Sequence, residues 1–371
     1  MRKHWLDNLR WVTVLLVLFY HVIYFYNNKG VFGGIGGFGP YPEYPQYQDV
    51  VMYILYPWFM PLLFLLAGVC ARYALEKYSS REWFKARTRK LLVPGTIGLF
   101  VFHWMVGYFN SLGAGADALA AIPQPVRYII WALTGIGPLW FIQLLWVLSL
   151  LLLLVRRLDK ADKFYLWCGK VFGGSKGIVW TILLGVLYWL AEQVLVRNPD
   201  PQGMDGLLNL YKPVFYLVVF LMGYFVFSHE AVQEALKKAW IPLLGCAVVA
   251  GGVLIGTTVG ECNTTPEYMA SPLSCLFGWL ACLALIGWFQ ACFNRTSAFA
   301  GYMTRSSYGL YIVHYLVVAA IGYLLKTYTQ LPVWAIYVIL TVAVFTLSPL
   351  LYELLRRIPF VRWAVLGEKK R

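Results

Sequence analysis

The sequence predicts an all-α integral membrane protein that crosses the bilayer about ten times and forms a single domain over residues 1–371. A strongly apolar composition, a series of long apolar runs and a one-sided distribution of basic residues support this fold class. Apolar residues make up 60% of the chain and charged residues only 13%, whereas a soluble domain carries about 25% charged residues. The aromatic share of 18% fits the belts that form at membrane interfaces.

Ten apolar runs are long enough to cross a hydrocarbon core of about 30 Å as helices. Polar segments separate each run from the next, and none of these segments is long enough for a second globular domain. Because ten is even, we expect both termini on one side of the membrane. The predicted spans are residues 9–27, 50–70, 91–109, 138–155, 177–196, 211–228, 241–259, 273–293, 306–326 and 332–355.

The positions of Lys and Arg test this count. With the N-terminus in the cytoplasm, all but five of the 31 Lys and Arg residues fall in cytoplasmic segments, as the positive-inside rule requires. Removing or adding one span would destroy this asymmetry, so we predict that both termini are cytoplasmic. The five residues on the outer side are Lys29, Arg127, Arg197, Lys212 and Lys326.

Charge and cysteine content exclude two function classes. A net charge of +14 would suggest a nucleic-acid partner in a soluble protein. Here the charges lie between apolar runs, so we expect membrane lipids with anionic headgroups as partners, and no nucleic acid. The seven Cys residues follow no metal-ligand spacing and mostly lie in apolar runs, which favours buried structural thiols and predicts no metal site.

The first apolar run carries a polar stripe formed by Arg10 and His21. At about 100° per residue, a helix brings these two side chains to within about 20° of each other and separates them by about 16 Å along its axis. Asp7 lies one turn before Arg10 and can pair with it. Polar groups at membrane depth usually face a bundle interior or a wet cavity. We interpret His21 as a candidate general base; a histidine that only bonds a neighbouring helix is the alternative.

A second polar cluster lies near the inner end of a late span, in the stretch RSSYGLYIVH. Ser307, Tyr311 and His314 follow i, i+4, i+7 spacing and therefore share one helix face. We expect His314 to lie at about the same depth as His21. Taken singly, each of these side chains would be an ordinary interhelical hydrogen-bonding group.

A third cluster, SSREWFKARTRKLLVP, lies where the chain re-enters the membrane from the cytoplasm. Arg87 and Lys90 are three residues apart and point the same way, with Arg89 between them. One interpretation is an anchor on lipid headgroups. The other is a site for a phosphate-rich cytosolic ligand, which needs several fixed cations.

Two further polar groups leave their roles open. Glu192, near the outer end of the fifth run, either meets a polar acceptor or faces water. His103 lies in the third run without a partner at helical spacing.

These residues occur in patterns that resemble the membrane acyltransferase 3 family. The Arg-x10-His of the family's first span, usually preceded by Asp, is matched by Asp7, Arg10 and His21. MPLLFLLAG, residues 60–68, is similar to the family's second span, and SYGLYIVH, residues 307–314, matches its late Ser-Tyr-x-x-Tyr-x-x-His.

Two more family patterns appear with departures. The family's Arg-x-x-Arg before Leu-x-x-Pro is present as Arg87, Lys90 and Pro94, and Lys keeps the charge but loses bidentate geometry. The Leu-Trp-Phe stretch appears at residues 139–141, with Pro138 where a His often stands. The stretches LLAG and RKLLVP are most similar to those of the glucan biosynthesis protein C branch, whose members succinylate periplasmic glucans.

The resemblance implies a multi-pass acyltransferase of the cytoplasmic (plasma) membrane. Its donor would be cytosolic acetyl-CoA or succinyl-CoA, consumed as a substrate, with no permanently bound cofactor. The donor phosphates would bind near Arg87, Lys90 and Arg89, with Arg10 close by, and the family pattern adds Trp140 to the donor-binding residues.

The resemblance also implies how the acyl group moves. His21 would act as general base on a hydroxyl of an extracytoplasmic carbohydrate, and Tyr311 or His314 would steady the developing charge. A transporter or flippase of a lipid-linked sugar or small polar solute is the alternative, because it would use the same buried polar groups. The Arg10–His21 stripe disfavours an inactive scaffold.

Overall fold

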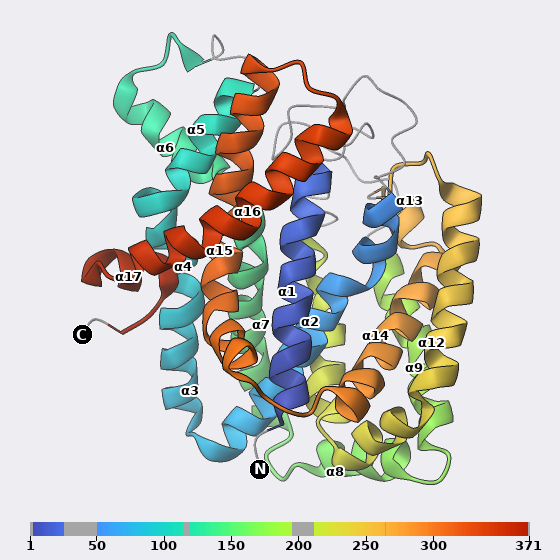
Figure 1. The fold of residues 1–371 in the computed structure, drawn as a ribbon. Helices are drawn as coiled ribbons and strands as arrows, with labels where there is room; N and C mark the ends of the chain where they lie inside the picture. Colours follow the sequence, from blue (N-terminus) through green and yellow to red (C-terminus); the bar gives the residue numbers. More distant parts are fainter. Residues whose placement is uncertain (1–2, 26–49, 114–118, 195–210, 264, 370–371) are drawn as a thin grey trace.

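A computed structural model describes residues 3–25, 50–113, 119–194, 211–263 and 265–369. These residues form helices joined by short segments, and no strand occurs among them (Figure 1). The all-α class predicted from the sequence is therefore confirmed.

Eight helical segments of the described chain are long and apolar enough to cross a membrane. The third is a continuous stack of α3 (Ser80–Arg87), η2 (Thr88–Leu92), α4 (Val93–Gly98), η3 (Leu99–His103) and α5 (Trp104–Gly113), and the fourth joins η5 (Gly137–Leu139) to α7 (Trp140–Leu158). The others are α1 (His4–Phe25), α2 (Val50–Lys77), α12 (Glu230–Thr258), α14 (Pro272–Cys292), α15 (Ala298–Tyr328) and α16 (Val333–Leu355).

The described residues thus give eight candidate spans, or nine with one bent pair, against the ten predicted. The two remaining predicted runs fall on shorter apolar segments. Helices α8 (Lys163–Gly173) and α9 (Gly177–Gln193) are bent by 117° and make a ninth span if they are counted together. Helix α11 (Pro213–Met222) continues through η6 (Gly223–Phe227). Each predicted run thus falls on helical residues over most of its length. Residues 26–27 and 195–196 lie outside the described residues.

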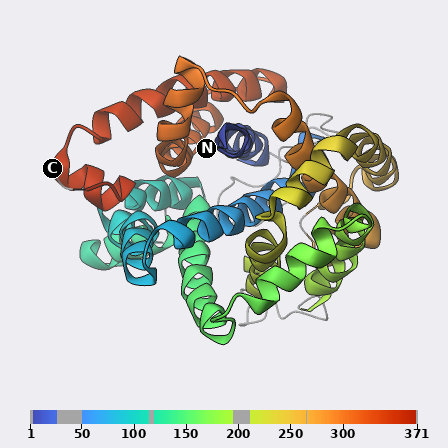
Figure 2. The ribbon, with the colours of Figure 1, turned by 90° about the horizontal axis from the view of Figure 1, so that it is seen from below.

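The first helix lies inside the bundle. Figure 2 shows α1 surrounded by other helices, and it contacts α15, α2, α14 and α16. Its inner end is fixed by Asn8, whose amide donates hydrogen bonds to the carbonyls of Phe293 (2.7 Å) and Arg295 (2.8 Å), in the segment between α14 and α15. This enclosure explains why polar side chains on α1 face cavities of the protein.

A proline shapes the third span. Pro94 has no N–H and its ring crowds the carbonyl four residues earlier, so a regular helix is interrupted there. The chain takes a π-helical turn at η2, in which the N–H of Val93 donates to the carbonyl of Thr88. The freed carbonyl of Lys90 accepts a hydrogen bond from the Tyr308 hydroxyl on α15. The proline thus places Lys90 at a contact between the third span and α15.

Helices α2 and α11 approach each other closely at two glycines. A Cβ at Gly68 would lie 2.0 Å from the carbonyl oxygen of Phe220, and one at Gly223 would lie 2.1 Å from that of Leu65. Small residues permit such backbone contact in membrane bundles. This crossing fixes α2, which forms walls of both cavities described below.

Candidate active site

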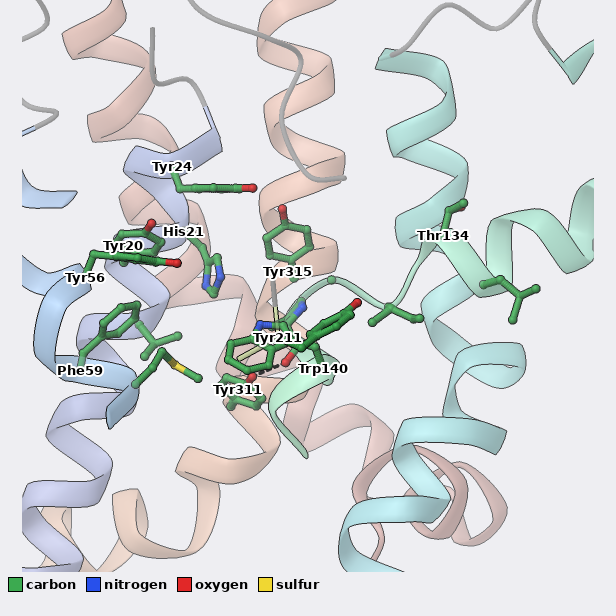
Figure 3. A pocket seen from close by; sticks show the side chains of 16 residues that line it. Tyr20, His21, Tyr24, Tyr56, Phe59, Thr134, Trp140, Tyr211, Tyr311 and Tyr315 are labelled. Carbon is green, nitrogen blue, oxygen red and sulfur yellow. Dashed lines mark hydrogen bonds between the residues drawn. The ribbon is translucent and has the colours of Figure 1, made fainter. Parts of the chain in front are cut away.

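A cavity of about 250 Å³ opens beside His21. His21 from α1 faces side chains of α2 and α15, including Tyr56 and Tyr315, and Trp140 from α7 closes another side (Figure 3). We call this the outer cavity. Its further lining residues are Val17, Tyr20, Tyr24, Phe59, Met60, Leu133, Thr134, Ile136, Gly137, Pro138, Tyr211 and Tyr311.

The ring of His21 is hydrogen-bonded to that of His314. His314 is fully buried, its Nδ1 lies 2.7 Å from the carbonyl oxygen of Tyr311, and its Nε2 lies 3.0 Å from Nδ1 of His21. A carbonyl only accepts hydrogen bonds, so Nδ1 of a neutral His314 carries its proton and Nε2 is an acceptor. Nδ1 of His21 then donates to it, which leaves the lone pair of a neutral His21 on Nε2. This tautomer follows from the hydrogen bonds and makes Nε2 the basic atom of the pair.

Aromatic side chains hold the His21 ring in its plane. Tyr315 presents its edge at 5.2 Å between ring centroids and 85° between planes, and Tyr20 and Tyr24 pack at 5.7 Å and 6.1 Å in similar geometry. Edge-to-face pairs of this kind are the favoured arrangement of aromatic rings. The His21 ring is therefore oriented by packing as well as by His314.

A second cavity of about 440 Å³, the inner cavity, lies nearer the inner end of α1. Arg10, Arg87, Lys90 and Arg305 line it, and no acidic side chain is among its described lining residues. Arg10 is paired with Asp7 at 3.1 Å. The remaining lining residues are Val14, Leu63, Ala67, Cys70, Trp83, Ala86, Leu91, Phe141, Leu145, Thr304, Ser307, Tyr308 and Tyr311.

Aromatic rings and a carbonyl position two of these cations. The guanidinium of Arg87 lies 5.2 Å from the ring centroid of Trp83, and the Lys90 ammonium lies 4.2 Å from that of Tyr308. Lys90 also donates to the carbonyl of Leu366 at 3.1 Å. Cation–π contacts of this kind hold a cation without neutralising it. The inner cavity is therefore a cationic site.

Tyr311 lies between the two cavities and lines both. Its hydroxyl donates a hydrogen bond to the carbonyl of Pro138, and its ring packs edge-on against Phe141. Its own carbonyl accepts the bond from His314. One residue thus separates the cavities with its side chain and orients the histidine pair with its backbone.

The structure divides the site residues predicted from the sequence into two groups. His21 and Tyr311 line the outer cavity, with His314 bonded to His21 from outside its lining, whereas Arg10, Arg87 and Lys90 line the inner one. Three placements differ from the sequence interpretation. Trp140, predicted to bind the donor with the cations, lines the outer cavity. Arg89 and Asp7 line neither cavity, and Asp7 reaches the inner one only through its ion pair with Arg10.

Sequence reasoning missed Tyr56, Tyr308 and Tyr315 as site residues, together with Arg305. The sequence does indicate the two tyrosines of α15, because Tyr308, Tyr311 and Tyr315 follow i, i+3, i+7 spacing and share a helix face. No comparable signal marked Tyr56, which reaches the outer cavity from another helix.

The sequence left the roles of Glu192 and His103 open, and the structure shows where both side chains lie. Glu192 is buried and forms an ion pair with Lys212, in a small pocket that shares Tyr56 with the outer cavity. His103 is fully buried in η3 and lines neither cavity. Within the described residues, no group of three or more His, Cys, Asp or Glu side chains is placed to hold a metal ion.

An ion-paired cluster on the inner side anchors the segment before α8. Arg72, 7% exposed, binds both carboxylate oxygens of Asp162 at 2.8 and 3.2 Å, and its guanidinium stacks on Tyr165 at 3.6 Å. Hydrogen bonding to this guanidinium lowers the pKa of the Asp162 carboxyl. The cluster joins α2 to α8 away from both cavities.

Comparison with known proteins agrees with this geometry. A family model described as an acyltransferase domain, acyltransferase 3, matches residues 3–353. The chain belongs to that family. The protein is thus a multi-pass membrane acyltransferase, and the family favours the enzyme over the transporter or flippase. No curated protein and no solved structure matches the chain.

Proposed function

We propose that this acyltransferase moves an acetyl or succinyl group from a cytosolic acyl-CoA to a hydroxyl of an extracytoplasmic carbohydrate in the cytoplasmic (plasma) membrane. One observation carries the proposal: a cationic cavity and a cavity with a poised imidazole meet at Tyr311. Acyl-CoA has a phosphate-rich end and a thioester at the end of a long arm. The phosphate-rich end suits the cationic inner cavity, and the thioester suits the outer cavity beside His21.

The inner cavity supplies what the phosphates need. Arg87 and Lys90, both in the third span, offer positive charge without a described acidic lining residue to cancel it. Arg10 on α1 adds a guanidinium that is paired with Asp7. Arginine donates in a planar fork that matches phosphate oxygens, and Lys acts as a point charge. In this proposal the phosphates bind there and the pantetheine arm extends past Tyr311 toward His21.

The outer cavity supplies the acid–base chemistry. The acceptor hydroxyl gives its proton to Nε2 of His21 as its oxygen attacks the thioester carbon. His314 accepts the hydrogen bond of the His21 Nδ1–H and so stabilises the imidazolium that forms. The tetrahedral intermediate collapses with cleavage of the carbon–sulfur bond, and the imidazolium returns its proton to the departing thiolate, which leaves as free CoA.

Tyr311 is the residue we assign to the developing oxyanion. Tyr311 is the one residue that both linings share among the described residues, and its hydroxyl donates to the carbonyl of Pro138. Turning that O–H toward the tetrahedral oxygen would stabilise the transition state. The tyrosines and Trp140 around His21 present flat apolar faces and hydroxyls, which suit a sugar as acceptor.

The experiment that tests this proposal measures free CoA thiol and acylated acceptor. Purified protein in nanodiscs receives acetyl-CoA or succinyl-CoA with and without a soluble glucan. We expect turnover with one donor, its loss in His21→Ala, and its retention in His4→Ala, a histidine on the same helix that lines neither cavity. Turnover that persists in His21→Ala would overturn the assigned base, and release of no CoA by the wild type would overturn the donor.

A further inference from the structure

The C-terminal helix α17 (Pro359–Leu366) is fitted against the third span, next to the inner cavity. The carbonyl of Leu366 accepts the hydrogen bond from Lys90. Gly367 follows with φ +62°, and a Cβ there would lie 2.6 Å from the carbonyl oxygen of Arg89 and 2.8 Å from Cα of Lys90. Glycine is favoured here because it adopts a left-handed backbone conformation without strain and has no Cβ to clash with the third span. The end of α17 is therefore held against a residue of the inner cavity.

A third cavity, of about 290 Å³, lies between the end of α16 and α17. Three cations, Arg356, Arg362 and Lys369, line it with the carboxylate of Glu368. Arg356 is also ion-paired with Glu353 at 3.1 Å, so Arg362 and Lys369 supply the excess positive charge. Arg362 lies one helical turn before Leu366, whose carbonyl binds Lys90. Glu368 directly follows Gly367, which packs against Arg89 and Lys90. The third cavity therefore lies close to the inner cavity and has a net positive lining.

The guanidinium of Arg362 has hydrogen-bonding capacity that the described residues do not use. Its Nε and Nη2 are shielded from solvent and have no hydrogen-bond partner among these residues, and the same holds for Nε of Arg89. Buried N–H groups are rarely left without an acceptor, since the lost hydrogen bonds to water are not replaced. An arginine that merely extends to water would keep these atoms exposed. An acceptor is therefore missing at this position.

We propose that the pocket lined by Arg356, Arg362 and Lys369 is a second phosphate-binding site. A phosphate group carries the charge that the lining lacks, and its oxygens match the fork formed by Nε and Nη2 of an arginine. Two sources offer this chemistry: the 3′-phosphate of an acyl-CoA held by the inner cavity, or the headgroup of an anionic phospholipid. The first source rests on the function proposed above, and the second does not.

The test compares wild type with Arg362→Gln in nanodiscs, in two arms. The first measures KM for acetyl-CoA or succinyl-CoA and for the corresponding 3′-dephospho-acyl-CoA. The second measures retention of phosphatidylglycerol against phosphatidylcholine by native mass spectrometry. Arg357→Gln, an exposed neighbour that lines no cavity, is the matched control, and Arg362→Lys keeps the charge without the fork.

The two sources give different results. If the site binds the donor, the wild type prefers the 3′-phosphorylated donor by roughly tenfold, and Arg362→Gln removes that preference with little change in kcat. If it binds lipid, Arg362→Gln lowers phosphatidylglycerol retention and leaves the donor preference intact. Arg362→Gln that matches wild type in both arms overturns the proposal. Absence of turnover in the wild type would count against the proposed function, and the lipid arm would then decide this proposal alone.

Discussion

The imidazoles of His21 and His314 meet at 3.0 Å although 293 residues separate them in the chain. His314 takes its direction from the Tyr311 carbonyl and leaves only an acceptor for His21. In the proposed mechanism the pair acts as an oriented base and its support, comparable to a catalytic histidine held by a carboxylate. His314 differs from a carboxylate in carrying no charge, so it orients His21 without creating a buried anion.

The orienting role of His314 predicts different effects for two amide substitutions. In His314→Gln the amide oxygen can stand near the position of Nε2 and accept the hydrogen bond from His21, whereas in His314→Asn the shorter side chain does not reach it. We expect kcat to fall by roughly a hundredfold or more in His314→Asn and by clearly less in His314→Gln, with KM for the donor nearly unchanged in both. Steady-state kinetics of acyl transfer check this, and equal losses in the two variants would argue against orientation.

The position of Tyr311 between the cavities predicts that its hydroxyl limits hydrolysis of the donor thioester. Tyr311→Phe removes the hydroxyl that bonds to Pro138 and keeps the ring. The barrier between the cavities should loosen and admit water to the thioester, because closure of an active site is what excludes hydrolysis. We expect total CoA release to fall, because the variant lacks the O–H assigned to the oxyanion. We also expect the ratio of CoA released to acceptor acylated to rise several-fold. Tyr308→Phe, at a residue that lines the inner cavity alone, is the comparison. A ratio that stays at the wild-type value in Tyr311→Phe would contradict a separating role.

The position of Arg87 in the inner cavity predicts that its replacement by alanine weakens binding of the acyl-CoA donor. Its guanidinium lines the inner cavity and is held over Trp83. Replacing it by alanine removes one charge-assisted contact to phosphate, which corresponds to a rise in donor KM of roughly 10- to 100-fold. The exposed Arg81, on the same helix and outside the cavity, should tolerate alanine without a change in KM. Calorimetric binding of a non-reactive acyl-CoA analogue would measure the same difference, and equal affinities in the two variants would exclude a role for Arg87.

Asp162 predicts a pH-dependent contribution to folding. Its carboxyl pKa is lowered by the hydrogen bonds from Arg72, so the folded state is favoured while the carboxyl is ionised. Asp162→Asn should lower the free energy of unfolding by about 1 kcal/mol at pH 7, a modest value because the pair is partly exposed. The difference from wild type should shrink once the pH falls below about 4, where the unfolded carboxyl protonates. Thermal unfolding in nanodiscs at pH 7 and pH 3 measures it; a difference that grows at low pH would have the wrong sign.

The sequence determined the fold class, the positions of the apolar runs and the polar stripes. Apolar runs of membrane length become helices because backbone groups in lipid must be satisfied within the segment. Helical spacing also determines which residues share a face, so the amino-acid order alone pairs Arg10 with His21 and Tyr311 with His314. These inferences depend only on local geometry and on the cost of polar groups in hydrocarbon.

Only the tertiary structure decided which residues of different helices meet, because spacing along one helix carries no information about its neighbours. Only the packing of α15 against α1 shows that His314 supports His21, and only the position of α7 puts Trp140 in the outer cavity. Tyr56 joined the site from α2, and α17 brought Arg362 and Leu366 beside Lys90. The physical reason is that a membrane helix is apolar on most of its surface, so its sequence carries little information about which neighbour it packs against; close contacts such as Gly68 with Phe220 select that neighbour.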